Sequence, residues 1–249
     1  MGIVQLIDPF YVDLPEDTYL RAPTVGQICW IVTSHMYRIP IIADVERADP
    51  TEHIATRFHL RPMTEADYRV KQRLPLKTLA LRATEELLIQ RSNLRPAIVV
   101  AGGMTIFPDV ERLLKQRGRK HLQEDSILVV PVYGVEGEDH QGGFPPFMVA
   151  RIRALLYRQF FFLPRANSPL PYEGVARLDR LHVAFPESSP GVRSPAYRPK
   201  RRALSQEALA CILAMLRQLF GSDREEELEA VKAIVREALP EEARVPHTS

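Results

Sequence analysis

One apolar stretch near the start of the chain reads Gly26-Gln27-Ile28-Cys29-Trp30-Ile31-Val32. Isoleucine, valine and tryptophan fit the pleated surface of a sheet, and a proline and a glycine just before such a run are typical of the start of a strand. We therefore predict a buried strand here. Residues 96–101 and 126–132 have the same character and predict two more core strands, and residues 39–45 and 159–163 predict further extended segments.

A different pattern follows in residues 174–183, which read Gly-Val-Ala-Arg-Leu-Asp-Arg-Leu-His-Val. Polar and apolar residues alternate there, which predicts one strand with two distinct faces. Side chains two positions apart on a strand project to the same face. Arg177 and Asp179 are therefore expected to share a face with Val175.

Helical spacing of apolar residues replaces this alternation elsewhere. It predicts one or two helices over residues 64–93, divided near Pro75, and further helices over residues 108–116, 148–156, 204–220 and 223–239. Three consecutive phenylalanines, Phe160 to Phe162, are interpreted as core. Short strands in a mixed chain with C-terminal helices indicate an α+β protein, built on either a small barrel or an open sheet.

The composition narrows the functional classes. The chain has 249 residues, of which 45% are hydrophobic, which excludes global disorder. A net charge of +2 produces no field over the whole molecule that demands a nucleic acid or an anionic membrane. Residues 223–249 are acidic, whereas five basic residues lie between residues 191 and 202.

The location of the protein is predicted from what the chain lacks. No apolar run approaches the ~18 residues of a membrane-spanning helix, and no basic-then-apolar signal opens the sequence. Cys29 and Cys211 lie far apart, which fits neither a disulfide framework nor a metal-ligand spacing. We expect a cytoplasmic protein in a reducing compartment, with no membrane partner.

Five segments resemble, in the same order, segments of the PemK/MazF family of toxin endoribonucleases. They are residues 26–32, 94–100, 128–134, 174–180 and 200–207. Residues 26–32 resemble the family's Gly-x-Ile-x-Trp-Leu-Val strand, residues 128–134 its Val-Val-Pro-Val-Thr-Ser strand end, and residues 174–180 its Gly-Val-Val-Arg-x-Asp-Gln strand. Together the five segments cover less than half of the chain.

This resemblance implies an α+β fold with an SH3-like (PemK/MazF-type) small β-barrel, a helical insertion and C-terminal helices. The predicted organisation is an N-terminal arm at residues 1–22, a barrel domain at 23–222 with its insertion at about 39–91, and an acidic helix and tail at 223–249. The resemblance also implies a homodimer that cleaves single-stranded RNA without a metal or cofactor. An antitoxin or another protein is the expected protein partner.

The resemblance assigns roles to four residues. Asp179 would be the base that removes the 2′-hydroxyl proton, and Arg177 the acid or the phosphate clamp; we prefer the clamp because the pKa of arginine exceeds ~12. Arg95 would face the active groove. Tyr133 stands with Gly134 where the family has Thr-Ser, and its phenol can still donate a hydrogen bond. Separately, the basic segment Lys200-Arg201-Arg202 is a candidate for binding RNA phosphates.

Several alternatives stay open. An arginine and an aspartate two residues apart can be a simple surface ion pair, and the Lys200–Arg202 segment can simply keep a loop solvated. The family's short loop between its first two strands is replaced here by residues 34–93, whose three histidines, His35, His53 and His59, could supply an imidazole. The chain can also be a catalytically inactive module of this fold that binds RNA or protein.

Overall fold

The computed structural model describes residues 2–20, 22–35, 38–47, 56–68, 85–102, 126–135, 143–165, 170–189, 192–221, 226–237 and 239–240. The chain is of the mixed α+β class, as predicted, and the sheets of its described residues are mostly antiparallel. It forms two compact units: residues 1–32 with 94–249, and residues 33–93. The second unit contains the predicted insertion.

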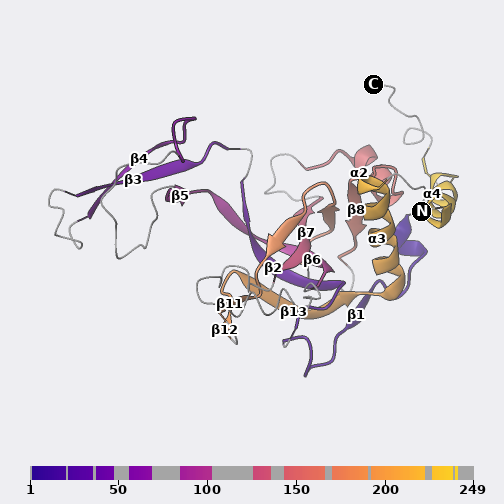
Figure 1. Ribbon diagram of the computed structural model, residues 1–249. Coiled ribbons are helices and arrows are strands. Elements are labelled where there is room, and N and C mark those ends of the chain that lie inside the picture. Colours follow the sequence, from indigo (N-terminus) through magenta and orange to yellow (C-terminus); the bar gives the residue numbers. More distant parts are fainter. Residues whose placement is uncertain are drawn as a thin grey trace. The chain divides into compact units, whose positions relative to one another are not determined.

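Eight strands of the described residues form one sheet (Figure 1). Its order is β1 (Tyr11–Asp13), β13 (Tyr197–Leu204), β2 (Gln27–Ser34), β6 (Ser92–Ala101), β7 (Ile127–Gly134), β9 (Gly174–Arg177) and β8 (Phe160–Leu163), with β10 (His182–Ala184) also paired to β7. In the described part of the chain β1 and β8 are the two ends of this path and do not pair with each other. The sheet is therefore open, and the closed barrel we expected is not formed by these strands. A separate two-stranded sheet joins β11 (Glu187–Ser189) to β12 (Val192–Arg193).

The apolar runs became core strands. β2, β6, β7 and β8 match the predictions for residues 26–32, 96–101, 126–132 and 159–163. Their side chains fill the interior from both faces, and Phe161, Phe162 and Ile98 have 1% or less of their surface exposed. Burying each such side chain contributes about 1.5–3 kcal/mol to folding, which explains why these runs dominate the architecture.

The predicted strand over residues 174–183 is interrupted. β9 pairs with the end of β7 (Val132↔Ala176), β10 pairs with its beginning (His182↔Val129), and the register shifts between them. The extra residues form a bulge at residues 178–181, where the Arg180 amide donates to the Arg177 carbonyl at 3.0 Å. The fully buried Leu178 anchors this bulge in the core. The prediction of one continuous strand was wrong, because residues 178–181 leave the ladder between β9 and β10.

Among the described residues, the first unit contains the helices α2 (Pro146–Arg153), α3 (Gln206–Phe220) and α4 (Glu226–Glu237). α3 begins where the Ser205 hydroxyl accepts a hydrogen bond from the Ala208 amide, and it ends at Gly221, in agreement with the prediction for residues 204–220. The nearly buried Lys232 of α4 donates to Gln218 of α3 at 2.6 Å. The helix predicted over residues 108–116 lies outside the described residues.

The N-terminal segment is part of the core. We predicted an extended arm over residues 1–22, but Ile3 of η1 (Ile3–Gln5), Ile7 and Phe10 are buried in the main hydrophobic cluster. The Tyr11 hydroxyl donates to the Pro164 carbonyl at 3.0 Å, and β1 pairs with β13. The weak alternation of residues 1–22 gave no sign of this role, because the contacts that bury the segment are made with residues distant in the sequence.

The second unit contains a three-stranded antiparallel sheet with the order β4 (Thr56–Pro62), β3 (Ile41–Arg47) and β5 (Leu88–Ile89). The Arg61 side chain binds both Asp44 and Asp67, which ties the turn after β4 to β3. The predicted helix over residues 64–93 was wrong for its described residues: residues 65–68 form a turn, and residues 85–93 are not helical and contain β5, in which Ile89 pairs with Ile41. Residues 69–84 of that helix lie outside the described residues.

Candidate functional site

Arg177 and Asp179 form a closely fitted ion pair. Arg177 is the last residue of β9, and Asp179 lies in the bulge that follows it. The guanidinium donates two hydrogen bonds, Nε to Oδ1 at 2.8 Å and Nη2 to Oδ2 at 2.6 Å. Of the two side chains, 25% and 35% of the surface is exposed, so solvent reaches the pair. The two side chains are neighbours, as expected, but the bulge brings them together and not the alternation of a regular strand.

The pair fixes the charge of both groups. The hydrogen bonds from Arg177 hold the pKa of Asp179 below its ordinary value, against the opposing effect of partial burial. The same hydrogen bonds raise the pKa of Arg177. At neutral pH the site therefore holds a carboxylate and a permanent cation, and any action of Asp179 as a base depends on its position and not on a raised pKa.

Arg95 and Tyr133 lie beside this pair. The guanidinium carbon of Arg95, on β6, is 4.6 Å from the centre of the Tyr133 ring on the neighbouring β7. Tyr133 is opposite Val175 of β9 and is close enough to contribute to the raised pKa of Arg177. Contacts between three adjacent strands thus bring the four predicted catalytic residues together.

Other side chains at this site were not predicted. The Arg177 guanidinium carbon lies 5.1 Å from the centre of the Phe160 ring, which covers one face of the cation. His182, on β10 just after the bulge, is partly buried, and this burial, with Arg180, lowers its pKa, so its imidazole is neutral at pH 7. The alternation of residues 174–183 was the only sequence feature that involved His182. The bulge that changes the direction of these side chains has no recognisable pattern in the sequence.

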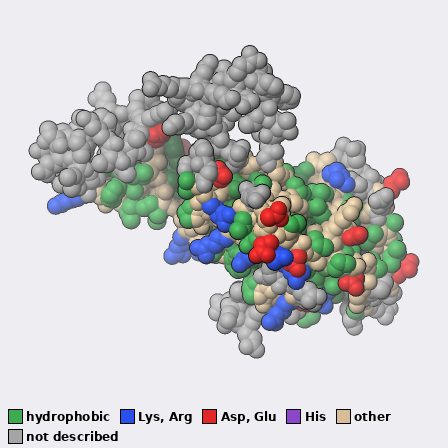
Figure 2. Space-filling view, turned by 90° about the horizontal axis from the view of Figure 1, so that it is seen from below, with side chains coloured by type: hydrophobic (Ala, Val, Ile, Leu, Met, Phe, Trp, Pro, Cys, Tyr) green, Lys and Arg blue, Asp and Glu red, His purple; other side chains and the backbone are tan. Residues whose placement is uncertain are grey.

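The basic segment lies elsewhere on the sheet. Lys200, Arg201 and Arg202 belong to β13, which is separated from β9 by β2, β6 and β7, or about 19 Å at the usual strand spacing. Arg202 pairs with Asp13 at 3.2 Å and Arg201 with Glu16 at 3.7 Å. The segment is therefore not brought to the Arg177 pair, and acids of the N-terminal region offset part of its charge. On the face shown in Figure 2, Lys and Arg side chains likewise gather beside Asp and Glu.

The remaining histidine and metal candidates add little. His59 is exposed on β4, opposite Asp44, and His35 follows β2, both in the second unit; His53 lies outside the described residues. Among the residues that the structure describes, no group of three or more His, Cys, Asp or Glu side chains could hold a metal ion. Within the same residues, no helix has the length and apolarity needed to cross a bilayer.

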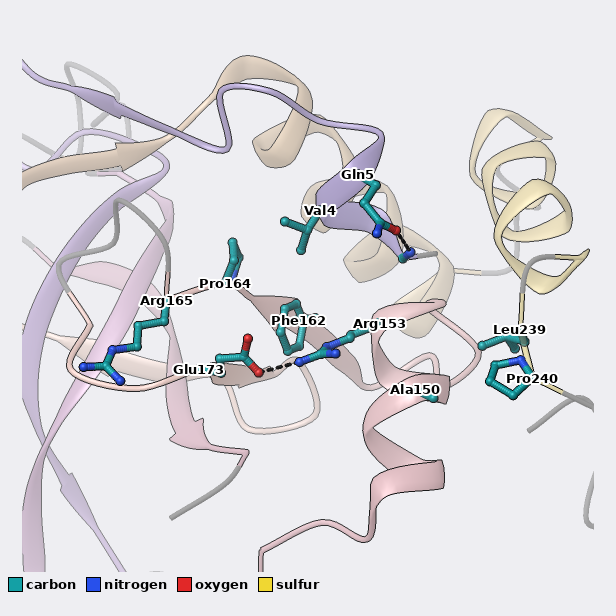
Figure 3. A pocket seen from close by; sticks show the side chains of 11 residues that line it. Val4, Gln5, Ala150, Arg153, Phe162, Pro164, Arg165, Glu173, Leu239 and Pro240 are labelled. Carbon is teal, nitrogen blue, oxygen red and sulfur yellow. Dashed lines mark hydrogen bonds and ion pairs between the residues drawn. The ribbon is translucent and has the colours of Figure 1, made fainter. Parts of the chain in front are cut away.

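A pocket of about 450 Å³ opens at the other end of β8 and β9 (Figure 3). Its wall includes the ion pair between Arg153 of α2 and Glu173, whose Nη2 and Oε2 atoms are 2.6 Å apart. The Arg153 guanidinium carbon is 4.9 Å from the centre of the Phe162 ring. Sequence reasoning missed this pocket because its residues come from four segments far apart in the chain.

Comparisons of the chain with protein-family models, with curated proteins and with solved structures find no match.

Proposed function

We propose that this protein is an endoribonuclease of the PemK/MazF type that cleaves single-stranded RNA without a metal. The observation that supports this proposal is the solvent-accessible, doubly hydrogen-bonded pair of Arg177 and Asp179, with Arg95 and Tyr133 beside it. A carboxylate next to several cation and phenol donors is the minimum set for attack of a 2′-hydroxyl on the adjacent phosphorus.

The proposed reaction assigns one task to each group. Asp179 accepts the 2′-hydroxyl proton, using a lone pair that Arg177 leaves unoccupied, because a carboxylate has about four acceptor sites. The 2′-oxygen bonds to phosphorus, and the bond from phosphorus to the 5′-oxygen breaks. Arg177 and Arg95 stabilise the pentavalent dianion, and the Tyr133 hydroxyl donates to a phosphate oxygen. Water protonates the departing 5′-oxygen, and the hydroxide that forms takes the proton back from Asp179. The products are a 2′,3′-cyclic phosphate and a 5′-hydroxyl.

Further expectations about the fold, the assembly, the protein partner and the location form part of the same proposal. The open sheet would correspond to the family's SH3-like core, with an inserted second unit that the family lacks. A homodimer, an antitoxin or other protein partner and a cytoplasmic location follow from the family resemblance. Sedimentation across micromolar concentrations tests the dimer, and a monomer throughout that range would contradict it.

The cleavage experiment uses mixed-sequence single-stranded RNA in EDTA. We expect the unmodified protein to yield fragments with 2′,3′-cyclic ends, and Arg177→Ala and Asp179→Asn each to lower the rate at least about 100-fold, as expected for loss of a transition-state contact. Arg180→Ala, an exposed neighbour of the same bulge, is the matched control and should retain the rate. Intact RNA with the unmodified protein at high concentration would reject the nuclease.

One observation favours a second candidate, a catalytically silent module that binds RNA or protein. The Arg177 guanidinium is already engaged by both oxygens of Asp179 and by the Phe160 ring. If that engagement persists with RNA present, the protein would bind RNA without cutting it. RNA that is retained in a filter-binding assay but stays intact identifies this module.

A further inference from the structure

β8 carries a repeated arrangement of an aromatic ring, an arginine and a carboxylate. Phe160 and Phe162 lie two positions apart and therefore project to the same face of the strand. Each ring lies under an arginine: Arg177 at 5.1 Å over Phe160, and Arg153 at 4.9 Å over Phe162. Each arginine is held in turn by a carboxylate, Asp179 or Glu173. The arrangement around Phe160 belongs to the candidate nuclease site, whereas the arrangement around Phe162 borders the pocket.

The pocket has the size and lining of a small-molecule site. Its volume of about 450 Å³ lies within the range of about 300–1,000 Å³ that such sites occupy. Figure 3 shows Arg165 at one end, Leu239 and Pro240 at the other, and the Arg153–Glu173 pair between them. All of these residues belong to the first unit, so the pocket does not depend on the second.

The charges of the described lining residues favour an anion. The described lining residues include two arginines, Arg153 and Arg165, and one carboxylate, Glu173, which leaves one positive charge in excess. Glu173 takes one N–H of Arg153, and a guanidinium has five, so donors are left for a ligand. The Arg153 side chain is 42% exposed and Arg165 is exposed, so both are accessible from solvent.

The stacking geometry favours a flat ring. Phe162 is almost fully buried, and the Arg153 guanidinium carbon lies over its ring at the wall of the pocket. Guanidinium planes stack on nucleobases as they do on aromatic side chains. Apolar side chains, among them Val4, Pro164 and Leu239, form the walls around this surface.

We infer that this pocket binds a nucleoside monophosphate unit, with the base stacked on Arg153 and the phosphate bound by Arg165. This site goes beyond the proposed nuclease and does not require it, because stacking and phosphate binding break no bond. The unit can come from a free nucleotide or from a nucleotide within a strand. The two sources share the same chemistry and are separated by the choice of probe.

Calorimetric titration of the full chain with AMP tests the site, with adenosine and ribose 5-phosphate as probes that lack the phosphate or the ring. We expect AMP to bind at least about tenfold more tightly than either probe, which corresponds to about 1.4 kcal/mol. Arg153→Ala and Arg165→Ala should each weaken AMP binding about tenfold or more. Glu173→Gln should strengthen it several-fold, because it removes the anion that competes for Arg153; loss of structure alone would not produce this gain.

Arg158→Ala is the matched control, because Arg158 is exposed and does not line the pocket. A second titration uses a hexamer of deoxyadenylate, which lacks the 2′-hydroxyl and so measures binding independently of the nuclease. Tighter binding than AMP, with the same dependence on Arg153, assigns the site to a strand; weaker binding assigns it to free nucleotides. The inference is overturned if AMP binds no better than its fragments, or if neither arginine variant changes its affinity.

Discussion

The carboxylate of Asp179 is bound through both oxygens by the guanidinium of Arg177, although the strand that carries Arg177 ends before Asp179 is reached. A regular strand would set two such side chains roughly parallel, about 6.6 Å apart along the chain. The bulge turns the aspartate back toward the arginine and leaves the pair partly exposed at the sheet surface. A local irregularity thus creates the geometry on which the nuclease proposal depends.

The lowered pKa of Asp179 predicts a pH dependence of stability. Because the folded pKa lies below the ordinary 3.8, the ionised group stabilises the fold above that pH, and this contribution is lost as the pH falls through the folded value. Asp179→Asn should therefore lower the free energy of unfolding at pH 7, by less than about 1 kcal/mol because the pair is solvent-screened. Urea denaturation from pH 7 to pH 2.5 measures the difference, which should shrink as the pH falls below 3.8. A constant difference would contradict the assignment.

Leu178 should act as a positioning residue for Asp179. Its fully buried side chain fixes the bulge, so Leu178→Ala should destabilise the protein by about 2–4 kcal/mol and lower RNA cleavage with an unchanged pH profile. Leu178→Met keeps most of the volume and should restore both properties. Cleavage that survives in a folded Leu178→Ala protein would show that the bulge does not position the carboxylate.

Tyr133 combines two roles that substitutions can separate. Tyr133→Phe keeps the ring under Arg95 and should retain stability, but it should reduce cleavage because the hydroxyl donor is lost. Tyr133→Leu should in addition lower the free energy of unfolding by about 0.5–1 kcal/mol through loss of the cation–π contact. A double-mutant cycle with Arg95→Ala measures that coupling, and a coupling energy near zero would refute the contact.

Tyr11 should reveal how firmly the N-terminal segment is attached. Tyr11→Phe removes the hydroxyl that donates to the Pro164 carbonyl and leaves that buried acceptor unpaired. We expect a loss of about 1–3 kcal/mol in unfolding free energy. Tyr19→Phe, a less buried tyrosine of the same segment, is the control. Equal stability of the two variants would place the segment outside the folded core.

Cys29 should be unreactive in the native protein. It is fully buried, and this burial raises its pKa to about 12, so the thiolate is scarce at pH 8. Mass spectrometry after alkylation at pH 8 should find Cys29 modified only in denaturant. Cys211→Ser provides a background in which Cys29 is the one remaining thiol. Rapid native labelling would contradict the burial of β2.

The sequence predicted most of what depends on local chemistry. The apolar runs of β2, β6, β7 and β8 and the helix α3 were recognisable, because burial and helical periodicity select residue types within a few positions. Residues 85–91, before β6, were mistaken for part of a helix, since their apolar residues fit either structure. Only the pairing of Ile89 with Ile41 settles that choice.

The two candidate sites also differ in how far the sequence could predict them. The residue types at the candidate nuclease site were present in the sequence, and Arg95, Tyr133, Arg177 and Asp179 were named because their segments resemble those of the PemK/MazF family. Their contacts required the register of three strands and the bulge that contains the buried Leu178. The pocket beside Arg153 depends entirely on long-range packing, because no local pattern relates the N-terminal segment, α2, the β8–β9 region and the residues after α4.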